Sequence, residues 1–124
     1  MARVEVEGGR RLRSTLKKAG VDMKRLSAIN RKAATMVANA ARPATPRLTG
    51  RLAASVRAGA TTRAGVVRAG RKSLPYAGPI HWGWPRRGIR PQPWIADTAS
   101  ATEGAWIPLY ERHMQEIVKE VKGK

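Results

Sequence analysis

A long amphipathic helix is the feature that most constrains what this chain can fold into. Residues 21 to 42 include the stretch "MKRLSAINRKAATMVANAAR", whose apolar side chains recur every three or four positions. That spacing gathers them on one face of a helix, which we expect to be core. Asp22 suits the N-cap, and Pro43 and Pro46 are expected to end the helix because proline cannot continue its hydrogen-bond ladder. The expected core face consists of Leu26, Ile29, Ala33, Met36, Val37 and Ala40.

A small antiparallel sheet is predicted to follow within residues 51 to 83. After a turn at Gly50, alternation from Leu52 to Ala58, the small residues of "GATTRAG" and the pair Val66 and Val67 indicate a β-hairpin. The segment "YAGPIHWG" predicts a third strand. The sheet residues expected beneath the helix are Val56, Val66 and Ile80.

Both ends of the chain carry further regular patterns. Within residues 1 to 20, "RVEVEG" alternates like a short strand, and Leu12 and Leu16 have helical spacing before Gly20. Residues 94 to 122 predict a helical region in which Ser100 and Glu103 form a capping box and Pro108 introduces a kink or a fresh start. The face expected to be shared in its final helix consists of Tyr110, Met114, Ile117 and Val121.

These patterns predict one α+β domain over residues 1 to 124. A long amphipathic helix packs on a small antiparallel sheet, made of a hairpin plus a third strand, and a C-terminal helix follows. The length and the 42% hydrophobic content suit one modest core. No signal peptide or membrane span is expected, because the N-terminus carries acids and the apolar runs are short.

Positive charge is concentrated in the middle of the chain. Residues 23 to 96 carry fifteen Lys and Arg and no acid, which supplies +15 of the net charge of +17. A chain so charged repels itself unless a polyanion lies nearby, and nucleic acid is the commonest polyanion. The alternative is a generally basic, soluble surface, which the absence of any acid over so long a stretch disfavours.

Chemical motifs are scarce in this sequence. His81 and His113 have no metal-ligand spacing, and Asp97 is the one acid close to the basic middle. The chain has no cysteine and no nucleophile motif, and "GATTRAG" does not complete a phosphate-binding loop. We therefore expect no enzyme activity, no cofactor and no metal.

The segment from 84 to 93 is expected to be a loop rich in proline, tryptophan and arginine. Prolines fix its backbone, which lowers the entropy lost when a loop is ordered at an interface. Among the nearby tryptophans, we expect Trp82 and Trp94 to lie partly in the core and Trp84 to be more exposed. The residues predicted to contact a neighbour or partner are Trp84, Arg86, Arg87, Arg90 and Trp94.

The order of three motifs resembles the head-to-tail joining or tail completion family of siphophages. The first is "PRLTGRLAAS", with Pro46, Thr49, Gly50, Leu52 and Ser55 at the matching positions. The second is "YAGPIHWG", with Tyr76, Ala77, Ile80, Trp82 and Gly83. The third is "RPQPW", with Arg90, Pro91, Pro93 and Trp94. The resemblance covers about residues 20 to 121, and His81 stands where an acidic residue is common in the family.

The resemblance implies a structural protein of the virion neck, assembled in the host cytoplasm. It would form a ring of six copies around the DNA channel, between the head connector or stopper and the tail terminator or tube proteins, with no membrane partner. Passing double-stranded DNA would be contacted weakly and without sequence preference. The residues expected to face that DNA, projecting from the hairpin or its ends, are Arg57, Arg63, Arg68, Arg71 and Lys72.

Two other function classes fit parts of the pattern. A free, sequence-nonspecific nucleic-acid-binding protein would explain the charge equally well, although no helix-turn-helix, zinc finger or RNP-type aromatic pair is visible. A nuclease would need clustered carboxylates to hold a divalent ion, and the basic middle lacks them. The first alternative stays open and the second is disfavoured.

Overall fold

The chain folds into a small antiparallel sheet covered by helices, seen in a computed structural model that describes residues 2–6, 24–46, 50–71 and 74–122. The elements are β1 (Ala2–Val6), α2 (Lys24–Ala44), α3 (Arg51–Ser55), β2 (Arg57–Ala60), β3 (Gly65–Ala69), α4 (Ala77–Trp82), the 3-10 turn η1 (Pro85–Arg87), α5 (Trp94–Ala101) and α6 (Glu103–Lys122). The predicted α+β fold class is confirmed, since a long amphipathic helix packs on an antiparallel sheet and a helix follows at the C-terminal end.

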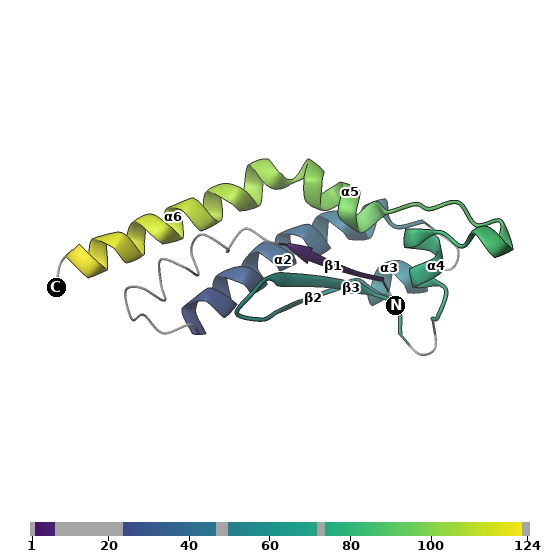
Figure 1. The fold of residues 1–124 in the computed structure, drawn as a ribbon, viewed down its shortest axis with the longest axis horizontal. Coiled ribbons are helices and arrows are strands. Elements are labelled where there is room, and N and C mark those ends of the chain that lie inside the picture. Colours follow the sequence, from purple (N-terminus) through teal and green to yellow (C-terminus); the bar gives the residue numbers. More distant parts are fainter. Residues whose placement is uncertain (1, 7–23, 47–49, 72–73, 123–124) are drawn as a thin grey trace.

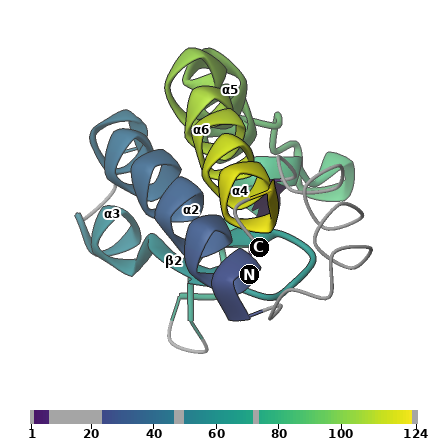
Figure 2. The same cartoon turned by 90° about the vertical axis from the view of Figure 1, so that its left-hand side faces the viewer.

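Strand β3 is the centre of the sheet, with β1 on one side and β2 on the other, both antiparallel to it. A tight turn joins β2 to β3, and the hydroxyl of Thr61 accepts hydrogen bonds from the backbone N–H groups of Arg63 and Ala64 there. Helix α2 lies across the sheet, and α5 and α6 lie alongside α2 (Figures 1 and 2). The sheet therefore has one face covered by α2 and one face turned away from it.

The core forms where the apolar face of α2 meets the inner face of the sheet. Leu26 and Val37 of α2 are fully buried, and so is Val67 of β3. The two layers are in close contact at Gly65, where a Cβ would overlap the backbone carbonyl oxygen of Asn30. Only glycine fits at this position, so β3 begins in direct contact with the backbone of α2.

Buried Asn30 links three elements. Its Nδ2 donates a hydrogen bond to the carbonyl oxygen of Thr61 in the hairpin turn, at 2.9 Å. The hydroxyl of Tyr110 in α6 donates to its Oδ1, at 2.6 Å. Burial raises the pKa of Tyr110 to about 12, because the phenolate would lose its hydration. The turn and α6 are therefore both held to α2 by one side chain.

The prediction of a third strand at residues 76 to 83 is wrong, because this segment forms α4. Pro79 lies in the first turn of the helix, where a missing N–H removes no helical hydrogen bond. Ala77 and His81, four residues apart, are the buried side of α4. The third strand of the sheet is β1, which agrees with the strand pattern of the N-terminal residues.

The first predicted strand of the hairpin is also too long. Residues 51 to 55 form α3, which follows Gly50 in the left-handed region at a φ of 79°, and β2 begins only at Arg57. The small side chains of "LAAS" fit a helical period as well as an alternating one. Ser55, buried at the end of α3, donates to the carbonyl oxygen of Leu52 and accepts from the backbone N–H of Gly70.

The prediction placed Val66 beneath the long helix, and the structure places Val67 there instead. Val67 packs beneath α2, whereas Val66 lies on the opposite face of β3, since alternate residues of a strand point to opposite sides. Val56 is buried in the core just before β2. Ile80 is half-buried and packs against the core from α4.

The remaining differences between prediction and structure concern the residues at which helices begin and end. Helix α2 continues through Pro43 to Ala44, so the predicted end at residue 42 is two residues early. The expected capping box is wrong, because Ser100 lies inside α5 and Thr102 separates α5 from α6. Pro108 lies inside α6. The predicted cap at Asp22 and the helix around Leu12 and Leu16 lie outside the described residues.

Candidate functional site

The outer face of the sheet carries a row of three arginines, one from each strand. Arg68 in the central strand pairs in register with Arg3 of β1 on one side and with Arg57 of β2 on the other. Residues paired in this way point to the same face of a sheet. Because Val4, Val67 and Ala58 at the neighbouring positions contact the core, the row lies on the face turned away from α2.

Like charges placed opposite each other across strands destabilise a sheet. The row must therefore be stabilised by local contacts or by an anion from outside. Arg57 donates hydrogen bonds to the backbone carbonyl oxygens of Ser55 and Gly70, each at 2.9 Å. Burial lowers the pKa of Arg57, and the positive charges of Arg71 and Arg68 lower it further. The guanidinium groups of this face are thus close enough to repel one another.

The side chain of Arg68 extends across β2. A Cβ on Gly59 would lie 3.6 Å from its Nη1, an ordinary van der Waals distance, so this guanidinium lies beside Gly59. Arg3 forms an ion pair with Glu5 of the same strand at 3.3 Å, and both side chains are about half exposed. An exposed pair of this kind contributes little stability and only partly offsets the positive charge.

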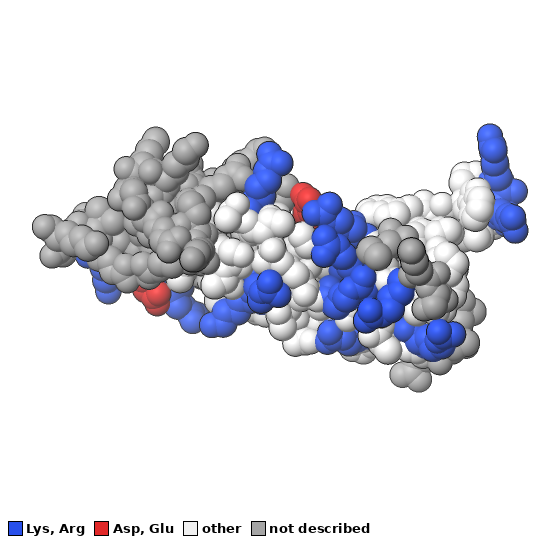
Figure 3. Space-filling model, turned by 90° about the horizontal axis from the view of Figure 1, so that it is seen from below, with Lys and Arg blue, Asp and Glu red and all other residues white. Residues whose placement is uncertain are grey.

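Further arginines extend the row toward α3. Arg51 and Arg71 line an open pocket together with Ala54, Ser55 and Leu74. Figure 3 shows Lys and Arg side chains gathered on this face of the molecule, and they outnumber the acidic side chains in view. Arg63 is exposed in the hairpin turn, and Lys72 lies outside the described residues.

Sequence reasoning found three members of this surface and missed two. Arg57, Arg68 and Arg71 were expected to face DNA together. Arg57 and Arg68 pair in register, and the positive charges of Arg71 and Arg68 lower the pKa of Arg57. Arg3 was missed because its partner Arg68 is distant in the sequence, and the pairing of β1 with β3 has no local signal. Arg51 was missed because residues 51 to 55 were expected to form a strand.

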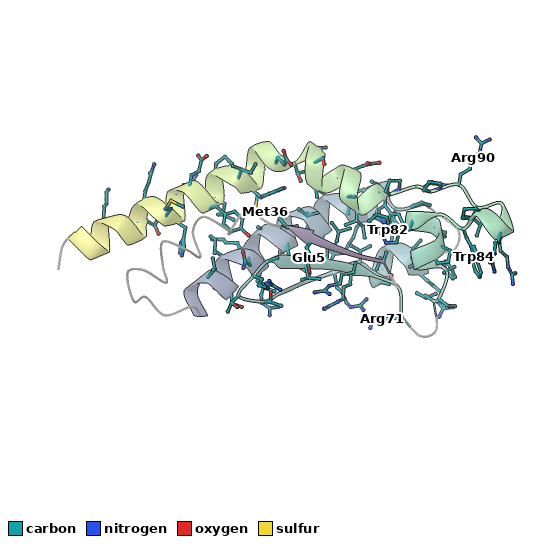
Figure 4. All side chains as sticks on the ribbon, in the orientation of Figure 1. Glu5, Met36, Arg71, Trp82, Trp84 and Arg90 are labelled. Atoms are coloured by element: carbon teal, nitrogen blue, oxygen red, sulfur yellow. The ribbon has the colours of Figure 1, made fainter. Side chains whose placement is uncertain are left out.

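A second exposed feature projects from the end of the molecule near α4. The arm, residues 82–91, carries Arg86, Arg87 and Arg90 and no acid, and Figure 4 shows Trp84 and Arg90 at this end. Paired backbone hydrogen bonds between Trp84 and Ile89, at 2.9 and 3.0 Å, close it into a short hairpin around η1. The expected loop at 84 to 93 is therefore an ordered turn.

Two glycines allow the sharp turns of the arm, because both adopt a positive φ that other residues rarely adopt. Gly83 has a φ of 82°, and a Cβ there would lie 2.9 Å from Cδ of Pro91, so both stems of the arm meet at this residue. Gly88 at the tip is also left-handed, at a φ of 65°. The guanidinium carbon of Arg87 lies 5.1 Å from the centre of the Trp84 ring, a cation–π contact.

The tryptophans are distributed differently from the prediction. Trp94 is buried in the core, with 6% of its surface exposed, so its expected core position is confirmed and its expected place at an interface is wrong. Trp82 is 56% exposed and Trp84 41% exposed, so Trp82 is not a core residue and is the more exposed of the two. Because α4 is a helix, its buried face falls on His81 and the adjacent Trp82 points outward.

His81 is fully buried between two tryptophan rings. Its ring centre lies 4.1 Å from that of Trp82 and 5.0 Å from that of Trp94, both edge-to-face. Its Nε2 accepts a hydrogen bond from the backbone N–H of Ala96, at 3.3 Å, which identifies the neutral ring. Burial lowers the pKa of His81, and the negative charge of Asp97 opposes this effect. Its role is to pack α4 against α5.

In the described ranges, no three acidic or histidine side chains come close enough together to hold a metal ion, and no helix is long and apolar enough to cross a membrane. Comparison of the chain with protein-family models, with curated proteins and with solved structures finds no match. The function must therefore be inferred from the arginine row and the arm.

Proposed function

We propose that this chain is a structural subunit of a phage neck, forming a homo-oligomeric ring that joins the head connector to the tail around the DNA channel. The observation that carries the proposal is the row of Arg3, Arg68 and Arg57 in register across the outer face of the sheet. In the ring, this face is turned toward the channel and its DNA, and the arm is turned toward neighbouring subunits.

Electrostatic repulsion favours this orientation. Six copies of a segment with a charge of +15 oppose ring closure unless the charges face water or phosphate. DNA in the channel supplies phosphate, and interactions with the DNA backbone read no bases. The arginines of this sheet face present positive charge without a helix that reads the bases in a groove, which suits weak attraction to a passing duplex.

The row can be tested by neutralising arginines that do not support the fold. We would change Arg3, Arg68 and Arg71 to Gln and leave Arg57 unchanged, because Arg57 donates to the backbone of Ser55 and Gly70. Affinity for random-sequence duplex DNA should fall, and the slope of log affinity against log salt should decrease by roughly 0.9 for each phosphate that the variant no longer neutralises.

A matched control variant removes the same charge from a different surface. Arg31 and Lys32 are exposed on α2, and Arg112 is exposed on α6. Their joint replacement by Gln should lower DNA affinity less and leave the salt slope near that of the unmodified chain. Equal losses in both variants would show that only net charge matters, and the proposed DNA-facing surface would be wrong.

A free, sequence-nonspecific nucleic-acid-binding protein is the second candidate, because the arginine row by itself suits it equally well. The two differ in what the chain does without DNA. Size-exclusion chromatography with light scattering, at low and high salt, should give a discrete ring for the neck subunit. A chain that stays monomeric at every concentration and gains mass only with DNA would support the free binder instead.

A further inference from the structure

Three large apolar side chains are exposed in the described part of the chain, and they fall on two separate surfaces. Trp82 and Trp84 belong to the arm, and Ile107, 38% exposed, belongs to α6. Exposed aromatic residues beside arginines are typical of the energetic centre of a protein interface. The arm therefore has the composition of a contact surface. Its arginines indicate that the surface it binds is acidic.

The exposed Ile107 lies between two acidic residues on the same face of α6. Glu103 precedes it by four residues and Glu111 follows it by four, so the three side chains are neighbours along one face of the helix. All three are exposed, and among the described residues neither Glu103 nor Glu111 forms an ion pair. We call these three residues the α6 stripe.

We propose that the arm of one copy docks on the α6 stripe of the next copy, with Trp82 and Trp84 against Ile107 and the arm arginines against the two carboxylates. This interface rests on the proposed ring and specifies what closes it. Each surface has an apolar centre with charges beside it, and the charges are opposite: the arm has three arginines and no acid, and the stripe has two glutamates. Complementary charge of this kind selects a partner and its orientation.

The arm cannot reach the stripe of its own chain. The arm lies at one end of the molecule, and α6 runs from the middle toward the opposite end (Figure 1). The interface therefore joins different surfaces of two copies, and such head-to-tail interfaces generate rings when the rotation closes. The arm is also held by its paired hydrogen bonds and by Pro85 and Pro91, whose rings fix φ, so little conformational freedom is lost on docking.

The first experiment exchanges the charges of the two surfaces. Arg86→Glu with Arg90→Glu makes the arm acidic, and Glu103→Arg with Glu111→Arg makes the stripe basic. Each pair alone should weaken self-association at least tenfold in a concentration series followed by light scattering. All four changes on one chain should restore it, because opposite charges again face each other between copies. Circular dichroism checks that each variant is folded.

Control substitutions separate this interface from net charge. Arg31→Glu with Lys32→Glu makes the same charge change as the arm variant on the exposed side of α2, and should leave association near that of the unmodified chain. The proposal is overturned if the arm variant associates normally, or if the four changes together associate no better than the arm variant alone.

A cross-linking experiment tests the interface even where association is weak. The natural chain has no cysteine, so a chain with Arg86→Cys can be mixed with one carrying Gly104→Cys, beside Ile107, and treated with a short bismaleimide. Gly104 has open space around it, so a side chain fits there. Mixed dimers should form at least tenfold faster than with Thr62→Cys, an exposed position in the hairpin turn. Equal rates would overturn the proposal.

The combined outcomes distinguish this inference from the proposed function. If the unmodified chain forms a discrete ring but the arm and stripe neither cross-link nor respond to charge exchange, the interface is wrong and the ring proposal stands. If the arm and stripe cross-link preferentially but no ring forms at any concentration, the interface stands and the ring proposal fails. DNA binding lost by the arm variant, with association unchanged, would assign the arm to nucleic acid instead.

Discussion

Replacing Tyr110 by phenylalanine tests the buried link between α6 and α2. The substitution removes one hydroxyl and leaves Oδ1 of Asn30 buried without the hydrogen bond that it accepts at 2.6 Å. A buried acceptor left unsatisfied costs about 1–3 kcal/mol, so the free energy of unfolding at pH 8 should fall by that amount. Urea unfolding followed by circular dichroism measures it.

The same variant gives a pH-dependent signature. In the folded chain the pKa of Tyr110 is raised from 10.0 to about 12, so the unfolded chain loses this proton first as the pH rises. The stability contributed by the protonated phenol is complete below pH 10.0 and is lost as the pH passes through about 12. The difference between the natural chain and Tyr110→Phe should therefore shrink as the pH rises from about 10 to about 12.

The size of the alkaline effect is bounded by the change in pKa. A difference of two pKa units corresponds to at most about 2.7 kcal/mol, and we expect about 1–2 kcal/mol because the site relaxes and admits water when the phenol ionises. Tyr76→Phe is the matched control, since the half-buried Tyr76 makes no side-chain hydrogen bond among the described residues. A stability difference for Tyr110→Phe below about 0.5 kcal/mol, or one constant from pH 8 to 11, would refute the reasoning.

Further predictions concern the core, the arm and acid stability. Leu26→Ala should lower the unfolding free energy by about 2–5 kcal/mol, and hydrogen exchange showing residues 23 to 41 unprotected in the assembled particle would contradict this. Gly65→Ala should cost about 1–3 kcal/mol in urea unfolding, because the new methyl group overlaps the backbone of α2. Trp84→Ala should leave melting nearly unchanged and weaken association, and a loss of about 3–5 kcal/mol would make Trp84 a core residue. The lowered pKa of His81 means that stability present above about pH 6.5 is lost as the pH falls below that value, so melting of the natural chain should fall more between pH 7.5 and 5 than that of His81→Gln.

The spacing of apolar residues predicted the long helices well, because a long helix places many apolar side chains on one face. The apolar stripe of α2 is the clearest case, and the helices after Trp94 follow it. Short segments were ambiguous, as in "LAAS", where alanines fit a helix or a strand, and in "YAGPIHWG", where Pro79 suits the first turn of a helix as well as the edge of a sheet. Six residues do not contain enough repeats to separate the two periods.

The candidate site was predicted in part for a related reason. The sequence shows that the middle of the chain is basic. The DNA-facing assignment of Arg57, Arg68 and Arg71 stays a prediction, and in the structure the charges of Arg71 and Arg68 lower the pKa of Arg57. The sequence could not show the register that aligns Arg3 with Arg68, because that pairing joins residues more than sixty positions apart. It also misplaced Trp82, since exchanging a strand for a helix at α4 changes which side chains point outward.

A single residue, Thr102, joins α5 to α6, so a small rotation at this residue moves the far end of α6 by a large distance. Helix α6 has 20 residues and is about 30 Å long, so a rotation of about 10° at Thr102 would move its far end by about 5 Å. The hydrogen bond from Tyr110 to Asn30 lies about 12 Å along the helix and resists that rotation. A small displacement of the first turns of α6 would therefore move its distal end several times farther.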